Sequence, residues 1–241
     1  MSEKEIEEEQ KSFERVLAAF QQYSLCIKQW LHEKRTMFAN LTEESKKRIF
    51  FGKLEESETV DAALFKEFQA LNDCIEKNQQ FLTNLVLPHA DLFENVKETH
   101  NQLAPAKIKV FQSDVEKVKS TLRQIAREWS DDGQEERNKS FKPLLEALAL
   151  RFPDLDKRNG VKVLTPGCGL GRLTWEIANL GFSSQGNEFS FHMLLCSFVI
   201  LNQYLFFLFK NFLRQLTGHF KDGKDKPVDH LSLDTFFLQC S

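Results

Sequence analysis

One segment, Val161 to Glu188, limits the possible folds of this chain because it reads as a strand, a glycine loop and a helix in direct succession. Three of its first four residues are aliphatic, which is typical of a buried strand. The run Pro-Gly-Cys-Gly-Leu-Gly follows at residues 166–171, and residues 172–180 then carry leucine and isoleucine at helical spacing. We therefore predict a buried strand over 161–164, a tight loop and a helix.

The glycines of this loop suit a bound cofactor. A ligand that lies across the carboxyl end of a strand needs the backbone close to it, and Gly167 and Gly169 have no Cβ to block the approach. The helix that follows directs its positive dipole end and its unpaired N–H groups at the same place. Glu188 ends a second short strand, predicted over 183–187, about 20 residues after the first glycine. An acidic side chain at that distance can accept both hydroxyls of a ribose.

The spacing of the glycines distinguishes between nucleotide cofactors. A dinucleotide fingerprint reads G-x-G-x-x-G, whereas this loop reads G-x-G-x-G and has Arg172 at the last position of the dinucleotide pattern. The pattern favours S-adenosylmethionine over NAD. The alternative is a glycine-rich turn that serves only tight packing. Cys168, within the loop, is expected to fill a small-residue position rather than to act as a nucleophile.

The residues around the loop resemble the carnosine N-methyltransferase family. The shared motifs are WEIA at 175–178, QGNEFS at 185–190 and REWS at 127–130, and the resemblance runs from about residue 115 to residue 202. It implies a class I methyltransferase fold and the transfer of a methyl group from S-adenosylmethionine to an imidazole nitrogen of carnosine, which gives anserine. Methylation of another imidazole, such as a histidine within a protein or a longer peptide, remains an alternative.

The resemblance also assigns cofactor contacts to a helix predicted over 113–129. Gln124 and Arg127 lie three residues apart and therefore on one face, and from spacing alone they read as a surface pair. In the family, a Gln and an Arg of this helix contact the cofactor, which implies that Arg127 pairs bidentately with the methionine carboxylate. Gln134 and Arg137 repeat the spacing and are the rival pair. His192, in the next apolar helix, is expected to be a packed or surface histidine.

Composition narrows the class of protein. The chain has 241 residues and a net charge of −3, so no global field attracts nucleic acid or anionic lipid. Its five cysteines are scattered without a C-x-x-C pair, which indicates neither a zinc site nor a disulfide framework. The acidic N-terminus lacks the apolar core of a signal peptide. We expect a protein of the cytoplasm and nucleus that binds neither nucleic acid nor membrane.

The predicted fold class is α/β, a partial Rossmann-like class I methyltransferase module preceded by an all-helical N-terminal extension. The expected domains are the helical extension at 1–112, the S-adenosylmethionine-binding module at 113–202 and a divergent tail at 203–241. Helices are predicted by their apolar stripes and breakers over 4–40, 60–86, 113–129 and 135–150, with a short helix capped by Thr42.

The segment after Glu188 leaves little room for the rest of a doubly wound sheet. A strand and its crossover take about 30 residues, so we expect an incomplete sheet and a chain that resembles a truncated or alternatively ended enzyme. A second hypothesis is therefore a catalytically inactive isoform that acts as an interaction or dimerisation module. The expected partner in that case is a second copy of the chain, in a homodimer. The apolar run 191–209 contains polar residues and is expected to be an aromatic patch rather than a membrane span.

Overall fold

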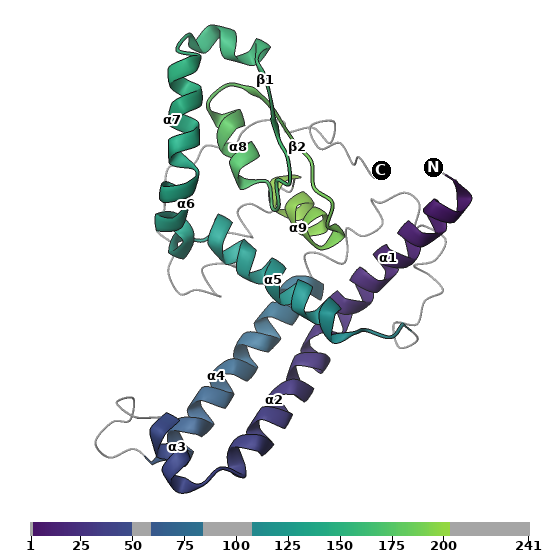
Figure 1. The fold of residues 1–241 in the computed structure, drawn as a ribbon, viewed down its shortest axis with the longest axis vertical. Coiled ribbons are helices and arrows are strands. Elements are labelled where there is room, and N and C mark those ends of the chain that lie inside the picture. The colour runs from purple at the N-terminus through teal and green to yellow at the C-terminus, as the bar shows by residue number, and fades with distance from the viewer. Residues whose placement is uncertain (1, 50–58, 84–107, 203–241) are drawn as a thin grey trace.

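The computed structural model describes residues 2–49, 59–83 and 108–202, which are mostly helical and include a small parallel sheet (Figure 1). The helices before the glycine loop are α1 (Glu3–Gln21), α2 (Tyr23–Ala39), α3 (Glu43–Ile49), α4 (Val60–Phe81), α5 (Gln112–Trp129), α6 (Gln134–Ser140) and α7 (Lys142–Arg151). The strands and the remaining helices are β1 (Lys162–Thr165), α8 (Arg172–Asn179), β2 (Ser183–Gly186) and α9 (Phe191–Asn202). The tail at 203–241 and the end of the helix predicted to reach residue 86 lie outside the described residues.

Helices α2 and α4 form an antiparallel hairpin that projects away from the rest of the molecule, with α3 near its tip (Figure 1). The prediction of one helix over 4–40 is wrong, because the chain breaks at Gln22. The side-chain amide of Gln79, from α4, donates to the carbonyl oxygen of Phe20 at 3.0 Å and accepts from the backbone N–H of Ser24 at 2.8 Å. These are the two groups that an uninterrupted helix would join, so Gln79 replaces the missing i to i−4 hydrogen bond.

The helix predicted over 135–150 is likewise divided, at Phe141, into α6 and α7. Pro143 lies in the first turn of α7, where a residue without an N–H is tolerated. In the interior of one continuous helix the same proline would remove a hydrogen bond and clash with the preceding turn. The break therefore follows from the proline. Thr42 caps α3 as expected, with its hydroxyl oxygen accepting from the backbone N–H of Ser45 at 3.3 Å.

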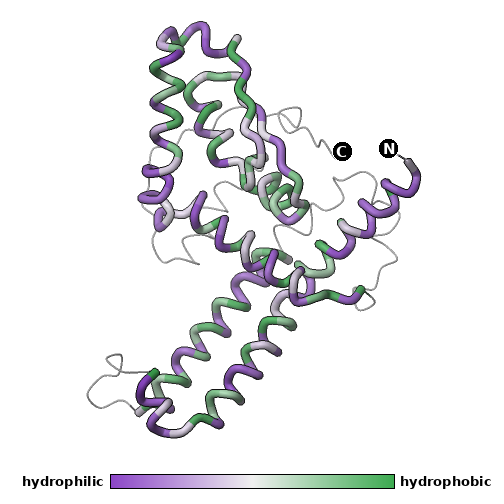
Figure 2. The backbone as a smooth tube through the Cα atoms, viewed as in Figure 1, coloured by the Kyte–Doolittle hydropathy of each residue, from purple (hydrophilic) through white to green (hydrophobic). Residues whose placement is uncertain are grey.

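The core lies where α1, α5 and α9 meet. Phe13 of α1 contacts Phe191 of α9 edge-to-face, with 5.1 Å between ring centroids, and Val118 of α5 is fully buried in the same cluster. Arg15 of α1 pairs with Asp114 of α5 at 2.8 Å. The first half of α1 is hydrophilic and α9 is largely hydrophobic (Figure 2), as expected if only the second half of α1 packs on the core.

Strands β1 and β2 pair in parallel, with Lys162 opposite Ser183 and Thr165 opposite Gly186, and α8 forms the crossover between them. The predicted order of strand, glycine loop, helix and strand is confirmed. The prediction that the first strand is buried is wrong, since Leu164 is 56% exposed. Among the described residues only β2 pairs with β1, so one edge and part of one face of the strand stay uncovered. The parallel pairing agrees with an α/β module.

No helix in the part of the chain that the structure describes combines the length and apolar character needed to cross a bilayer. Helix α9 covers the first part of the apolar run 191–209 and has 12 residues. The residues of that run beyond Asn202 lie outside the described part of the chain.

Candidate functional site

The glycine loop joins β1 to α8 with backbone conformations that glycine adopts readily. Gly167 and Gly169 have φ angles of +59° and +57°, in the region that L side chains rarely occupy. A Cβ at Gly167 would meet no atom within 4 Å, so the loop is open on that side. A Cβ at Gly169 would lie 3.3 Å from Oε1 of Glu128. One glycine therefore faces open space and the other lies against a carboxylate.

The backbone N–H groups of the loop are bound to the end of β2. Gly167 N donates to Asn187 Oδ1 at 3.1 Å, and Cys168 N donates to the Asn187 carbonyl oxygen at 2.8 Å. Gly169 N donates to Glu188 Oε2 at 2.9 Å. The loop is thus closed against the residues after β2. In this conformation the three N–H groups already have acceptors, so the glycines provide space and curvature rather than free donors.

Glu188 lies at the centre of these contacts. Its Oε1 accepts from the backbone N–H groups of Phe189 and Ser190, both at 2.8 Å, while Oε2 accepts from Gly169. A carboxylate has about four acceptor positions, so Glu188 retains capacity for one more donor. Binding of two ribose hydroxyls would therefore require one of the present hydrogen bonds to lengthen or exchange.

Helix α5 brings two polar side chains against the same loop. Trp129, near its end, donates from Nε1 to the carbonyl oxygen of Leu170 at 3.3 Å, which joins the helix to the loop. Five residues earlier, Gln124 Nε2 donates to Glu128 Oε1, and it lies 4.0 Å from the position of a Gly169 Cβ. The structure thus places Gln124 and Glu188 beside Gly169. Their contacts with a cofactor stay a prediction.

Glu128 is a buried carboxylate at the loop. It is 4% exposed, and its Oε2 is buried without a hydrogen-bond partner among the described residues. Burial raises the pKa of Glu128, against the opposing effects of the Gln124 hydrogen bond, of the nearby Arg172 backbone N–H and of the charges on Arg127 and Arg137. The Arg172 N–H does not reach hydrogen-bond geometry with either carboxylate oxygen. A second carboxylate therefore borders the loop beside Glu188.

Arg127 and Arg137, the two arginines that the sequence offers as alternative cofactor contacts, have different surroundings. The Arg127 side chain is 50% exposed, and its Nε lies 3.2 Å from Oε1 of Glu136. Arg137 Nη1 donates to the carbonyl oxygens of Arg127 and Ser130, both at 2.8 Å. Arg137 thus ties the end of α5 to α6, whereas the Arg127 guanidinium is accessible to a ligand that displaces Glu136. A third cation, Arg172, lies over Trp129 and Trp175 at 5.0 and 4.7 Å from the ring centroids.

Cys168 is packed beneath the loop. Burial, and then the nearby charge of Glu188, raise the pKa of the Cys168 thiol to about 11. The thiol stays neutral at neutral pH and is a poor nucleophile. A Cβ at Gly186 would lie 2.7 Å from Cys168 Sγ and 2.8 Å from Thr174 Oγ1, so the absence of a side chain at Gly186 lets the loop approach β2.

His192 is a packed residue. It is 5% exposed and contacts Phe20 edge-to-face, with 5.5 Å between ring centroids. Burial, and then the charge of Lys117, lower the pKa of His192 to about 4, although Asp114 opposes the shift. The neutral imidazole joins α9 to α1 and does not reach the loop through any hydrogen bond among the described residues.

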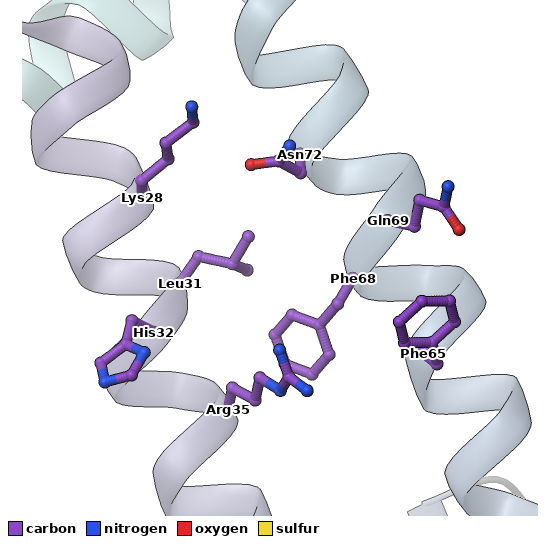
Figure 3. A pocket seen from close by; sticks show the side chains of 8 residues that line it. All are labelled: Lys28, Leu31, His32, Arg35, Phe65, Phe68, Gln69 and Asn72. Atoms are coloured by element: carbon purple, nitrogen blue, oxygen red, sulfur yellow. The ribbon is translucent and has the colours of Figure 1, made fainter.

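A separate groove of about 400 Å³ lies between α2 and α4 of the hairpin (Figure 3). Its walls combine Leu31 and Phe68 with the polar side chains of Lys28, His32 and Arg35. The hairpin projects away from the glycine loop (Figure 1). This groove is therefore distinct from the candidate cofactor site. Within the described ranges, no cluster of three or more His, Cys, Asp or Glu side chains has metal-site geometry.

Three residues of the site did not stand out in the sequence. Glu128 follows Gln124 by four residues, and this spacing on the helix already places the two side chains side by side. Gly186 and Asn187 directly precede Glu188. Their contacts with the loop depend on the register of β2 against β1, which no local pattern specifies.

Comparisons with known proteins extend the resemblance found in the sequence. Residues 105–222 match the family model described as carnosine N-methyltransferase, a segment longer at both ends than the shared motifs indicate. The chain is 32% identical over 199 residues to carnosine N-methyltransferase of Mus musculus, an alignment that covers 81% of this chain and 46% of the relative. It is 38% identical over 204 residues to that of Schizosaccharomyces pombe, which covers 81% and 50%.

The chain thus spans about half the length of the curated relatives that it matches. The recognition of the family from the loop motifs is confirmed. Residues 105–222 of this chain are therefore similar to the carnosine N-methyltransferase family.

Proposed function

We propose that this chain, which is similar to the carnosine N-methyltransferase family over its matched residues, binds S-adenosylmethionine at the glycine loop and transfers its methyl group to an imidazole nitrogen of carnosine, which yields anserine. The observation that carries the proposal is the loop itself. Gly167 faces open space, Gly169 lies between the carboxylates of Glu188 and Glu128, and the loop follows the first strand of a parallel pair. The names of the relatives support the substrate.

The residues present fit this cofactor. No atom lies within 4 Å of a Cβ position at Gly167, which leaves room for a ligand beside this glycine. Glu188 would hold the ribose by accepting one hydroxyl at its remaining acceptor position and the second in exchange for one of its present hydrogen bonds. Gln124 and Arg127 would address the methionine end, where the exposed guanidinium of Arg127 is suited to a carboxylate. The buried, unpartnered oxygen of Glu128 provides an acceptor that the protein itself does not satisfy.

The proposed module would be Rossmann-like, a reading that the parallel β1–α8–β2 unit supports. The bound sulfonium supplies an electrophilic methyl carbon, so the protein has chiefly to align a neutral imidazole nitrogen with it. The residues of this chain hold and orient the cofactor for that alignment. Two carboxylates at the loop, Glu128 and Glu188, together with Arg127 of the same helix as Glu128, suit a ligand that carries both cationic and anionic groups.

The proposal is tested by calorimetric titration of the 241-residue chain with S-adenosylmethionine. We expect saturable binding that Glu188→Ala weakens at least tenfold and that Glu135→Gln, an exposed change of charge on α6, leaves unchanged. A methylation assay with carnosine then tests the substrate, with other imidazole peptides as competitors. Absence of binding at high ligand concentration would exclude the proposed activity for this chain.

We further propose that the protein acts in the cytoplasm and nucleus on a small dipeptide and forms a homodimer. We expect no nucleic-acid or membrane partner. The net charge of −3 supports the last point. Sedimentation of the purified chain over a range of concentrations tests the oligomeric state. The non-enzymatic alternative of an interaction module has no comparable support, because the relatives carry the names of enzymes.

A further inference from the structure

A buried carboxylate at the glycine loop has one oxygen that the protein leaves unsatisfied. Glu128 is 4% exposed, its Oε1 accepts from Gln124, and its Oε2 has no hydrogen-bond partner among the described residues. Leaving a buried acceptor or charge unpaired is costly. A buried polar group that the fold leaves unpaired in this way is a candidate to bind a ligand.

The cations near Glu128 have partners of their own. Arg127 pairs with Glu136, Arg137 donates to two backbone carbonyl oxygens, and Arg172 donates to Glu176 from Nε at 2.8 Å and from Nη2 at 2.6 Å. None of these guanidinium groups forms a salt bridge with Glu128 in the described structure. The carboxylate is therefore not one half of an internal ion pair.

Glu128 is placed at the candidate cofactor site rather than elsewhere in the core. Its Oε1 lies 3.3 Å from the position that a Gly169 Cβ would occupy, and Gly169 is bound through its N–H to Glu188. The loop leads directly into α8, whose N-terminus begins at Arg172. The unsatisfied oxygen thus belongs to a side chain in contact with the loop that is proposed to hold the cofactor.

We infer that Glu128 binds the α-ammonium group of the methionine part of S-adenosylmethionine through the oxygen that the protein leaves unpaired; this inference rests on the proposed function. An ammonium group offers three N–H donors and a positive charge, whereas the sulfonium offers charge without a donor. Gln124 acts as a positioning residue by fixing Oε1. The adjacent Arg127 would take the neighbouring carboxylate, so consecutive residues of one helix would address the two groups on the same carbon atom.

The test compares Glu128→Gln with the wild-type 241-residue chain by calorimetric titration with four ligands. S-Adenosylmethionine and S-adenosylhomocysteine both keep the ammonium, and decarboxylated S-adenosylmethionine keeps the ammonium and the sulfonium. 5′-Methylthioadenosine lacks the amino-acid part altogether. We expect Glu128→Gln to weaken the first three ligands about 10- to 100-fold and to leave the fourth within about twofold of wild type. Glu135→Gln serves as the matched control.

Each other outcome overturns the inference. Equal loss for all four ligands would assign Glu128 a structural role, and unchanged affinity for S-adenosylmethionine would exclude contact. Loss for the sulfonium ligands without loss for S-adenosylhomocysteine would indicate pairing with the sulfonium. If the variant fails to unfold cooperatively, the wild-type chain is titrated with the deaminated cofactor, and a difference below about threefold overturns the inference. Absence of any cofactor binding by wild type would instead refute the proposed function, and the inference with it.

Discussion

The carboxylate of Glu188 holds the backbone of Gly169 by a hydrogen bond of 2.9 Å. The same side chain accepts two backbone N–H groups at the start of the next segment, so it organises the loop before any ligand binds. A residue with this double task is expected to affect both stability and affinity when it is changed.

We predict that Glu188→Ala lowers the free energy of unfolding by about 2 kcal/mol, because three backbone N–H groups lose their acceptor. The matched variant Asn187→Ala removes the acceptor of Gly167 N and leaves Glu188 in place. It should lower stability by about 1 kcal/mol and reduce cofactor affinity less than Glu188→Ala does. Urea denaturation and calorimetry measure the two effects. Equal losses of affinity in the two variants would contradict a ribose contact by Glu188.

Alanine substitutions at Gly167 and Gly169 should affect stability and cofactor affinity to different degrees. Gly167→Ala and Gly169→Ala should each cost about 1–2 kcal/mol of stability, since both residues have positive φ angles. Gly169→Ala should cost more, because its Cβ lies 3.3 Å from Glu128 Oε1. A Cβ at Gly167 instead enters the open space proposed for the ligand, so this variant should lose affinity out of proportion to its loss of stability. Equal affinity in the wild type and Gly167→Ala would place the ligand elsewhere.

Local patterns predicted the candidate site better than the wider fold. The order of strand, glycine loop, helix and strand depends on neighbouring residues, and the structure confirms it. The break between α1 and α2 was not predictable, because Gln79 reaches it from a helix more than 50 positions later. The exposure of Leu164 also depends on which strands flank β1, and not on its own apolar sequence.

Local sequence was also insufficient to predict which polar residues of the site are buried. Glu128 lies in a helix whose face toward the loop is set by the contact of Trp129 with Leu170. Its burial was therefore a tertiary property. Spacing identified Gln124 and Arg127 as a pair on one face and also places Glu128 beside Gln124. The pairing of Arg127 with Glu136 became evident only once α5 and α6 were packed together.

Arg127 of α5 should contribute to cofactor affinity, whereas Arg137 of α6 should contribute to stability. Arg127→Ala should leave the free energy of unfolding within about 0.5 kcal/mol of wild type, because exposed ion pairs contribute little. It should nevertheless weaken S-adenosylmethionine at least tenfold and leave decarboxylated S-adenosylmethionine unaffected. Arg137→Ala should cost about 2 kcal/mol of stability, since a charged donor to two carbonyl oxygens is lost. The reverse pattern would support Gln134 and Arg137 as the cofactor pair.

The amide of Gln79 should be required for the bend between α1 and α2. We predict that Gln79→Leu lowers the free energy of unfolding by about 1–3 kcal/mol, because Phe20 O and Ser24 N lose their only bridging group among the described side chains. Gln69→Leu, an exposed change of the same kind on α4, is the control and should have little effect. Urea denaturation followed by circular dichroism measures both. Equal stability of the two variants would contradict the bridging role.

His192 should make stability depend on pH. Its pKa is lowered to about 4 in the folded protein by burial and by Lys117, with Asp114 opposing, while an unfolded histidine titrates near its ordinary value of about 6.5. Between these values the unfolded state binds more protons, so stability is fully present above about pH 6.5 and falls as the pH is lowered towards 4.

We therefore predict that His192 removes about 2 kcal/mol from the free energy of unfolding between pH 7 and pH 5. His192→Phe preserves an aromatic ring against Phe20 and cannot take up a proton, so its loss over the same interval should be smaller by about that amount. Urea denaturation at the two pH values measures the difference, and the stability of the variant at pH 7 shows whether the ring is accommodated. If wild type and variant lose the same free energy, protonation of His192 does not control the contact between α1 and α9.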